Sequence, residues 1–299
     1  MIFAHIFDFV DEPTLNTNSI SSSKIVENSS NKIIEVLETD KKSVLKNFSF
    51  SSEWIDLSGQ QARYHNSLPM SQADKSYSWA MEIEDVLILR WSAIENKIYF
   101  AKEKNYSSER LQFWVYHTFF PFVLELMQKY HILHVGSVEV DGKPIVFSAF
   151  SFGGKSTMTD YFIQKGHTLL SDDTLAIEQQ GNDYYAIASY PFHRPYREPE
   201  SLGYHVTNFA MTPKPLNAFY MLEKSEADAE VKIVEVNGIE KFKAFHYSTF
   251  INFSFMKKRR FKFFTEMAKH IPVYRVTVPW DMDRLDEVYM TITKHCKSV

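Results

Sequence analysis

Short apolar runs separated by polar turns dominate the first third of the chain. The run Val86–Leu89 is followed by the turn residues 95–96 and by the run Lys97–Ala101, so this stretch predicts a β-hairpin. Residues 14–32 are rich in Ser, Asn and Thr, which is typical of a solvated loop or of a partly disordered segment. We interpret residues 1–104 as a mainly β region. It carries no recognisable chemistry and is a candidate for selecting a substrate.

The next stretch changes to helical periodicity. Apolar residues recur at helical spacing over residues 111–127. The helix is expected to begin at Ser107 or Ser108, whose hydroxyl can cap the first turn, and to run through Tyr130. Pro121 has no backbone N–H to donate, so we expect the helix to be kinked or divided there.

A hairpin then leads into a glycine-rich loop. Residues 132–140 and 144–148 are apolar runs on either side of the turn 141–142, an Asp-Gly pair that favours a hairpin. After the loop, residues 156–165 are compatible with a helix. Gly166 is expected to end this helix, because glycine readily adopts the left-handed conformation found after a helix C-terminus.

A second strand and an acidic pair follow this helix. The run 168–170 predicts a buried strand that ends at Asp172 and Asp173. In a sheet in which this strand runs parallel to the strand at 144–148, the two carboxyl ends lie side by side at one rim. We therefore predict an α/β fold in which a phosphate-binding loop (P-loop) and two aspartates meet at one edge of a mixed sheet. This P-loop domain is assigned to residues 105–299.

Composition places the chain among globular proteins. Of its 299 residues, 44% are hydrophobic and 15% aromatic, which is enough to form a substantial core. The net charge of −4 argues against a general nucleic-acid binder, which is usually basic. Cys296 is the only cysteine, so an internal disulfide and a cysteine-rich zinc site are excluded, and a reducing compartment is expected.

The pattern of the chain also bears on its location. The first residues lack the basic start of a signal peptide, and acidic residues interrupt their apolar run. No apolar stretch approaches the length of a membrane span. We expect a cytoplasmic protein that contacts neither membrane nor nucleic acid. Assembly into a homo-oligomer is left open.

Residues 147–157 match the P-loop pattern G-x-x-x-x-G-K-[ST] except at its first glycine, where Ala149 stands. Backbone N–H groups of such a loop, together with the N-terminus of the following helix, attract phosphate. In this pattern the lysine contacts the β- and γ-phosphates and the next hydroxyl binds Mg²⁺. A plain strand-to-helix turn with a solvated lysine is the alternative. The candidate nucleotide-binding residues are Gly153, Gly154, Lys155, Ser156 and Thr157.

Two acidic residues and one histidine complete the candidate site. Adjacent side chains on a strand point to opposite faces, so Asp172 and Asp173 are expected to play different parts, one toward the phosphates and one toward a metal or a supporting network. A solvated turn after the strand is the alternative. His134 precedes the strands that lead into the loop and could pair with an aspartate. The histidines of this half, His193 among them, have no zinc-site spacing.

Basic residues outside the loop give weaker signals. Arg194 and Arg197 belong to a proline-rich segment and could neutralise a transferring phosphate or grip an acidic substrate, although the sequence slightly favours a solvated surface loop. The basic run Lys257–Arg260, followed by phenylalanines, is better explained as a solvated helix face than as a binding site for a peptide or an acidic patch.

The stretch from Leu133-His134 through the loop and the block 164–173, Gln-Lys-Gly-His-Thr-Leu-Leu-Ser-Asp-Asp, resembles the core of HPr kinase/phosphorylase and of the broader HPr-kinase-like serine kinases. That family has a Leu-His before its first strand, a Gly-Lys-Ser loop and a Lys/Arg-Gly-His-x-Leu-x-x-Asp-Asp block. The segments 271–276 and 280–289 are similar to its closing strand and helix. The resemblance covers roughly residues 110–299.

The resemblance implies a fold related to that of phosphoenolpyruvate carboxykinase and a set of residue roles. Asp172 would be the general base acting on a serine hydroxyl, and Lys155 would hold the β- and γ-phosphates. Ser156 and Asp173 would bind Mg²⁺, and His134 would support the site. The glycine-rich signature of the bifunctional enzymes is missing, which favours a divergent member that modifies peptides, as lasso-peptide kinases do.

We therefore hypothesise an ATP- and Mg²⁺-dependent kinase that phosphorylates a serine on a peptide or small protein. One alternative keeps the chemistry but uses a free small molecule, serine or a sugar, as the acceptor. A second is a nucleotide-binding regulator without catalysis, to which the altered loop would be suited. A third is a scaffold whose loop binds nothing.

Overall fold

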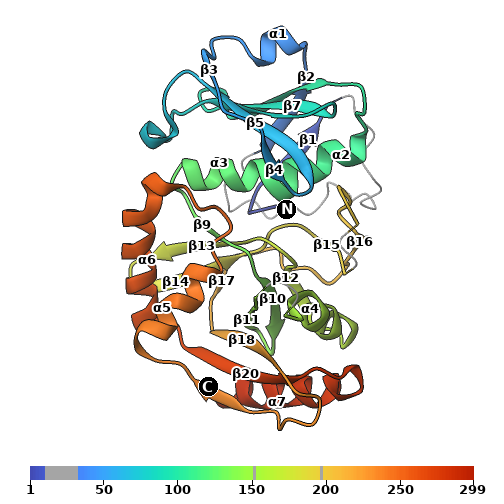
Figure 1. The fold of residues 1–299 in the computed structure, drawn as a ribbon, viewed down its shortest axis with the longest axis vertical. Helices are drawn as coiled ribbons and strands as arrows, with labels where there is room; N and C mark the ends of the chain where they lie inside the picture. The colour runs from blue at the N-terminus through green and yellow to red at the C-terminus, as the bar shows by residue number, and fades with distance from the viewer. Residues whose placement is uncertain (11–32, 151–152, 196–197) are drawn as a thin grey trace. The chain divides into compact units, whose positions relative to one another are not determined.

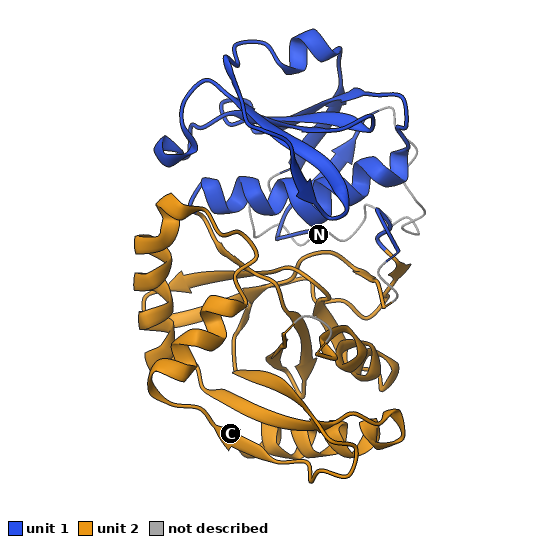
Figure 2. Cartoon of the chain, viewed as in Figure 1, with its two compact units in different colours: residues 1–128, 197–202 blue, residues 129–196, 203–299 orange. Residues whose placement is uncertain are grey.

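The computed structural model describes residues 1–10, 33–150, 153–195 and 198–299. The Ser- and Asn-rich segment 14–32 and the predicted site residue Arg197 lie outside the described residues. The chain forms two compact units (Figures 1 and 2). Unit 1 contains residues 1–128 and 197–202, and unit 2 contains residues 129–196 and 203–299.

Unit 1 contains a single β-sheet and the helical stretch that follows it. Its eight described strands form one sheet with the order β1-β2-β8-β7-β6-β5-β3, and β4 pairs with β5. The predicted hairpin is confirmed, because β7 and β8 pair in antiparallel register around a turn in which Asn96 has a φ of +56°. The strands are β1 (Ile6–Phe9), β2 (Ile33–Glu38), β3 (Phe50–Ser51), β4 (Ile55–Leu57), β5 (Gln60–Asn66), β6 (Trp79–Ile83), β7 (Leu87–Ser92) and β8 (Lys97–Lys102). Short helices α1 (Lys41–Val44) and η1 (Met70–Gln72) lie between them.

The helix predicted from Ser107 is present in three consecutive parts: α2 (Ser108–Phe113), the π-helical η2 (Trp114–Phe119) and α3 (Phe120–Leu126). Ser107 caps it as predicted, since its Oγ accepts the backbone N–H of Arg110. The change of helical type falls just before Pro121, which cannot donate an N–H and would clash with the preceding turn of a regular α-helix.

This helix belongs to unit 1, so the boundary between the compact units differs from the predicted one. The chain divides after Gln128, whereas the sequence suggested residues 104 and 105. The reason is aromatic packing against the sheet. The Trp79 ring stacks on Phe119 at a centroid distance of 4.8 Å, and the Trp91 ring meets Phe120 edge-on at 6.3 Å.

A short piece of later sequence completes unit 1. Residues 197–202 belong to it although the chain on both sides belongs to unit 2. Within this piece the Glu200 carboxylate accepts the indole N–H of Trp114 at 2.6 Å and the amide of Gln60 at 3.0 Å, and it forms an ion pair with Arg110. Charge-assisted bonds of this kind fix the segment in place.

A buried carboxylate joins three basic side chains in unit 1. Glu82 on β6 lies 2.9 Å from His65 Nε2, 2.7 Å from Arg63 Nε and 3.1 Å from Lys41 Nζ. The hydrogen bond from His65, with those from Arg63 and Lys41, lowers the pKa of Glu82 to about 2 against the opposing effect of burial. Its bonds therefore require the ionised form.

We predict that Glu82→Gln destabilises the protein by about 1–3 kcal/mol at pH 7, because the substitution removes charge-assisted hydrogen bonds from a buried site. The pKa of Glu82 is depressed on folding, so its contribution is complete above about pH 4.5 and is lost as the pH falls toward about 2. Urea unfolding at several pH values in this range should show that the difference in unfolding free energy between Glu82→Gln and wild type shrinks as the pH falls. A difference that stays constant with pH would contradict this, and the exposed Glu84→Gln is the control.

Unit 2 contains a mixed six-stranded sheet with the order β12-β10-β11-β18-β20-β19. Its strands are β10 (Gly136–Val140), β11 (Lys143–Ser148), β12 (Thr168–Ser171), β18 (Ala218–Ser225), β19 (Ile233–Glu235) and β20 (Val273–Pro279). A four-stranded sheet has the order β17-β14-β13-β9, with β9 (His131–Leu133), β13 (Leu175–Gln180), β14 (Asp183–Ile187) and β17 (Lys214–Pro215). The pair β15 (Phe192–His193) and β16 (Tyr204–His205) is separate.

The predicted hairpin before the loop is confirmed from Gly136 onward, where β10 and β11 pair in antiparallel register. Residues 131–133 instead form β9 and pair with β13. The expectation that the loop strand and the aspartate strand lie side by side needs correction. Strands β11 and β12 point the same way, but both pair with β10, which lies between them because its tight turn places it next to β11. Their carboxyl ends still share one rim.

Helices cover both faces of the six-stranded sheet (Figure 1). Adjacent strand residues point to opposite faces, so Phe147 packs with α4 and α7, whereas Val146 packs with α5 and α6. The helices are α4 (Lys155–Gln164), α5 (Gly238–Tyr247), α6 (Lys257–His270) and α7 (Leu285–Ser298), with short turns η3 (Ser254–Met256) and η4 (Met282–Arg284). The predicted strand and helix near the C-terminus correspond to β20 and α7. In the described parts of the chain, no helix combines the length and apolar character that crossing a membrane requires.

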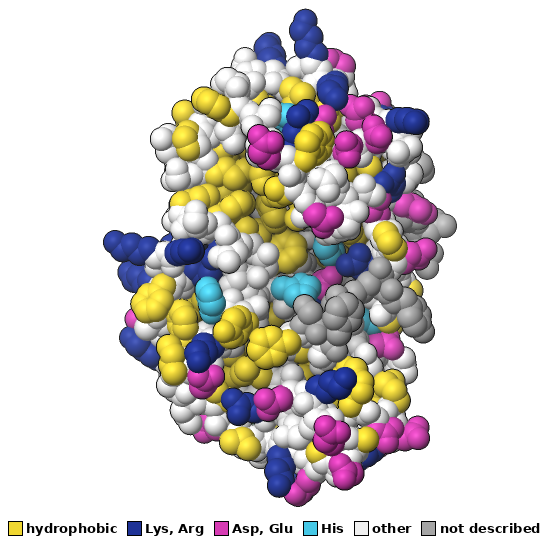
Figure 3. All heavy atoms as spheres, viewed as in Figure 1, with side chains coloured by type: hydrophobic (Ala, Val, Ile, Leu, Met, Phe, Trp, Pro, Cys, Tyr) yellow, Lys and Arg dark blue, Asp and Glu magenta, His cyan; other side chains and the backbone are white. Residues whose placement is uncertain are grey.

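The basic run at the start of α6 is only in part a solvated face. Lys257 and Lys258 are exposed, and Figure 3 shows Lys and Arg side chains gathered over this helix. Arg260 is buried, and its guanidinium donates to the Asn252 side chain and to the Ile251 carbonyl. One of the four charges thus stabilises the chain before α6.

Strand β10 and helix α4 approach closely at Gly136. A Cβ atom there would lie 2.1 Å from Thr159 Oγ1, which is buried and donates to the Lys155 carbonyl. Only glycine fits this contact without displacing the first turn of α4.

We predict that Gly136→Ala destabilises the protein by about 1–3 kcal/mol through overpacking. Adding Thr159→Ala should recover part of this loss, because it removes the atom that the new methyl group would meet. Urea unfolding of both single variants and of the double variant measures the coupling. If the stability losses of the two single variants simply add in the double variant, the contact between the new methyl group and Thr159 is not the cause of the destabilisation.

Candidate active site

The glycine-rich loop connects β11 to α4, and its residues on either side of the undescribed positions 151 and 152 lie close together. The Gly153 N–H donates to the Phe150 carbonyl at 2.8 Å, and a Cβ at Gly153 would lie 2.8 Å from that same oxygen. Gly154 is the N-cap of α4 with a left-handed φ of +86°, and no side chain caps the helix. The first N–H groups of α4 have no partner within the helix, which leaves them available to an anion.

Lys155 brings together the predicted residues of the site. Its side chain is only 6% exposed, and its Nζ donates to Asp173 Oδ1 at 3.1 Å and contacts His134 Nε2 at 3.1 Å. An ammonium group this deeply buried requires a charged partner. The start of α4, the end of β12 and the residue that follows the strand 131–133 therefore meet at this lysine.

Asp173 contacts basic groups on both of its oxygens. Its Oδ2 accepts the Arg194 guanidinium at 3.1 Å, while Oδ1 lies 3.1 Å from Lys155 Nζ and 3.5 Å from His134 Nδ1. Arg194, a predicted phosphate or substrate contact, therefore lies beside the loop. Two permanent cations, Lys155 and Arg194, therefore flank this carboxylate. With the neighbouring Asp172 carboxylate included, the formal charges of the four groups cancel.

Asp172, which like Asp173 follows the last residue of β12, has a different set of partners. It is buried, and its Oδ2 accepts the backbone N–H of Arg194 at 2.8 Å. Its Oδ1 lies 2.9 Å from His193 Nδ1. The backbone and the side chain of Arg194 thus each bind one member of the aspartate pair.

A histidine and an aspartate near the site were not singled out from the sequence. His193 is fully buried, and its ring nitrogens lie 2.9 Å from Asp172 and 3.3 Å from Asp160, although neither contact has hydrogen-bond alignment. The Tyr204 hydroxyl donates to Asp160 at 2.7 Å and its ring packs edge-on against His193. The pairing of β15 with β16 brings His193 next to Tyr204, whereas Asp160 lies on α4, so no local spacing signals this cluster.

A buried tyrosine lies next to the aspartate pair. Burial, with the negative charges of Asp173 and Asp172 adding to it, raises the pKa of Tyr190 well above its ordinary value. The phenol is therefore neutral at physiological pH. Tyr190 precedes the strand that carries His193 and is buried close enough to the two carboxylates to feel their charge.

Ser156 and Asp173 are the oxygen donors at this rim that could ligate Mg²⁺. Ser156 is partly exposed at the N-terminus of α4, and Asp173 supplies a carboxylate at the same rim. The described residues contain no group of three or more His, Cys, Asp or Glu placed to hold a metal by themselves. Mg²⁺ commonly binds through one or two carboxylates and substrate phosphates, so these two oxygen donors fit it. Thr157 is exposed on the first turn of α4.

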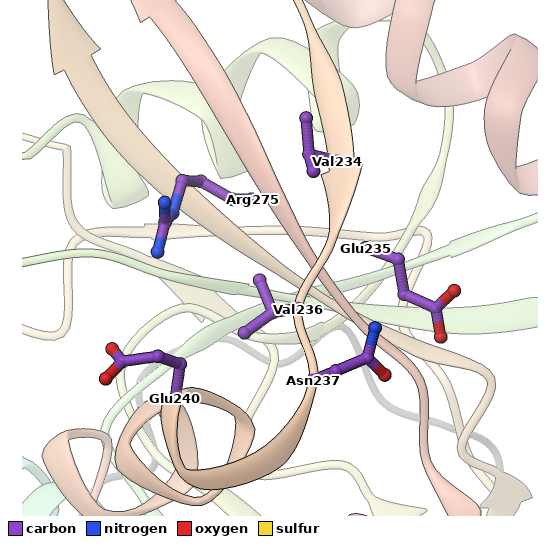
Figure 4. Close-up of a pocket in the computed structure, with 6 residues that line it drawn as sticks. All are labelled: Val234, Glu235, Val236, Asn237, Glu240 and Arg275. Carbon is purple, nitrogen blue, oxygen red and sulfur yellow. The ribbon is translucent and has the colours of Figure 1, made fainter.

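A pocket of about 190 Å³ lies elsewhere in unit 2, beside β19, β20 and the start of α5 (Figure 4). Its charged side chains do not converge, since Glu235 points to the opposite side from Glu240 and Arg275 (Figure 4). None of the predicted site residues lines this pocket.

Fold and site together define a mixed α/β protein in which the start of α4 and a buried aspartate pair meet at one sheet rim. No protein-family model matches the sequence, and no curated protein matches it. Among solved structures, the Hpr(Ser) kinase/phosphatase from Coxiella burnetii is similar to this chain, with 10% sequence identity and a TM-score of 0.34. The similarity covers 55% of this chain and 95% of that one. It assigns no role to any residue here, so the roles below rest on the geometry of this chain.

Gly203 provides a test of how the segment carrying His193 and Arg194 is held. A Cβ at Gly203 would lie 2.0 Å from the His193 carbonyl oxygen and 2.9 Å from Arg194 Cα, at a φ of +80°. We predict that Gly203→Ala destabilises the protein by about 1–3 kcal/mol more than Gly181→Ala. Gly181 is the matched control, with a φ of +64° and no atom within 4 Å of its Cβ position. Equal losses of unfolding free energy for Gly203→Ala and Gly181→Ala would show that the segment carrying His193 and Arg194 shifts to accommodate the methyl group without a measurable cost.

Proposed function

We propose that this protein is an ATP- and Mg²⁺-dependent kinase that transfers the γ-phosphate to a serine hydroxyl of a peptide or small protein. The observation that carries the proposal is the convergence on Asp173 of Lys155, from the start of α4, and Arg194. An uncapped helix N-terminus, a lysine and two carboxylates at one rim are the groups that phosphoryl transfer needs.

Each residue has a role that follows from its position. The first N–H groups of α4 would bind phosphate oxygens, and Lys155 would turn from Asp173 toward the β- and γ-phosphates. Ser156 and Asp173 would hold Mg²⁺, which supplies neutralisation of phosphate charge. His134 contacts the Lys155 ammonium and would keep it at the loop.

Asp172 would act as the general base. The acceptor hydroxyl oxygen attacks the γ-phosphorus in line while the bond from this phosphorus to the oxygen bridging to the β-phosphate breaks, so that ADP leaves. The hydroxyl proton passes to the Asp172 carboxylate. The backbone N–H of Arg194 holds this carboxylate in orientation, and the ring of His193 lies 2.9 Å from its other oxygen.

Exposed aromatic residues beside the loop support a peptide acceptor. Phe150 is 72% exposed and Tyr247 is 65% exposed, and their ring centroids lie 5.7 Å apart. Such a pair can contact the apolar side chains that flank an acceptor serine in a peptide. Free serine and sugars have no flanking side chains. Incubation with labelled ATP and separate pools of peptides and metabolites would distinguish the two acceptor classes.

We predict that Asp172→Asn lowers the rate of phosphate transfer by about 100- to 10,000-fold, the usual contribution of a general base. Asparagine retains an oxygen that can accept the Arg194 N–H, so the fold and the calorimetric affinity for ATP with Mg²⁺ should change little. The measurement is transfer from labelled ATP to the acceptor pool together with ATP titration of the same samples.

Asp183→Asn is the control for this experiment, since Asp183 is an exposed carboxylate in the β13–β14 hairpin. It should leave both transfer and binding unchanged. Transfer by Asp172→Asn at a rate near that of wild type would remove Asp172 from the role of base. ATP binding with no transfer to any acceptor by the wild type would favour a non-catalytic regulator.

A further inference from the structure

Three strands end at the rim where the loop lies. Strand β11 pairs in parallel with β18, and β18 pairs in parallel with β20, so all three present their carboxyl ends at the same edge of the sheet. The aspartates follow β12, on the other side of β11 in the sheet order. A nucleotide whose γ-phosphate faces the aspartates would therefore extend its nucleoside toward the ends of β18 and β20.

Trp280 occupies that position, directly after β20. Its side chain is 47% exposed, although a tryptophan usually buries most of its large apolar surface. The ring edge lies 3.6 Å from the point where a Cβ on Gly154 would be, so the indole reaches the first residue of the helix N-terminus. Its backbone N–H donates to the Ser225 carbonyl at 3.1 Å, which fixes the start of the side chain to the end of β18.

A lysine positions the indole ring. Lys224 on β18 places its ammonium over the Trp280 ring, 4.0 Å from the ring centroid. This cation–π contact orients the ring plane and adds positive charge next to the phosphate-binding loop. A rigid, partly exposed aromatic ring with a cation beside it is a suitable platform for a flat base linked to an anion.

We propose that Trp280 stacks on the nucleobase of the bound nucleotide, with Lys224 holding the indole in place. This inference rests on the proposed function, because it assumes that the loop binds the phosphates of the same nucleotide. Stacking on an aromatic ring uses the π-face that every base has, so the platform favours a base without selecting among bases. Base choice would need hydrogen-bonding groups in addition.

The test compares two ligands that share phosphates but differ in the base: ATP and inorganic tripolyphosphate, each titrated calorimetrically with Mg²⁺. Trp280→Leu should weaken ATP binding by about tenfold or more, the usual effect of losing base stacking, and leave tripolyphosphate binding unchanged. Trp280→Phe should retain most of the ATP affinity. Trp54→Leu is the matched control, since Trp54 is a partly exposed tryptophan of unit 1.

The outcomes separate this inference from the proposed function. Equal affinity of wild type and Trp280→Leu for ATP, or equal losses for ATP and tripolyphosphate, would overturn the stacking role while leaving the phosphate site intact. Failure of wild type to bind either ligand would overturn both. If Trp280→Leu does not fold, fluorescence decides: ATP, but not tripolyphosphate, should quench wild-type emission, and the quenching should be absent in Trp280→Phe. Quenching that persists in Trp280→Phe would contradict the proposal.

Discussion

The buried ion pair between Lys155 and Asp173 is the constraint on which the site of unit 2 depends. Removing a charge from water costs several kcal/mol, and this cost is offset only where a partner of opposite charge lies at hydrogen-bond distance. The pair meets this condition at 3.1 Å, with Arg194 on the other carboxylate oxygen. The start of α4, the end of β12 and the segment after β15 therefore have to meet.

This arrangement also means that the site is assembled before any ligand arrives. The lysine, both aspartates and the arginine are already in contact, so a phosphate would compete with Asp173 for the Lys155 ammonium. A competing carboxylate lowers the affinity for an anion, but it holds the lysine beside the helix N-terminus. Preorganised charge of this kind needs little rearrangement when negative charge develops on a substrate.

Local sequence was sufficient for the elements that form the site. Periodicity and turn residues predict the capped helix from Ser107, the hairpin from Gly136 and the strand that ends at Asp172, because these depend on neighbours a few residues apart. The intervening position of β10, the contacts of His193 with Asp160, and the burial of Arg260 depend on pairing between distant segments. No local spacing contains that information.

The boundary between the two compact units also depends on packing between distant segments. The helix that begins at Ser108 reads as a new element after a run of strands, which suggested a boundary before it. Its aromatic side chains, however, fill the inner face of the preceding sheet. The compact units are decided by which apolar surface a helix covers, and helical spacing does not identify the sheet that it packs against.

The anchoring of Glu200 affects the order in which the protein can be completed on the ribosome. Unit 1 is not finished when its helix has been made, because residues 197–202 supply the carboxylate that Arg110, Trp114 and Gln60 bind. When Glu200 is synthesised, Lys155, Asp173 and Arg194 have already been translated. Unit 1 can therefore be completed only after residues 129–196 of unit 2 have been translated. No single break in the chain would yield either unit as one continuous segment.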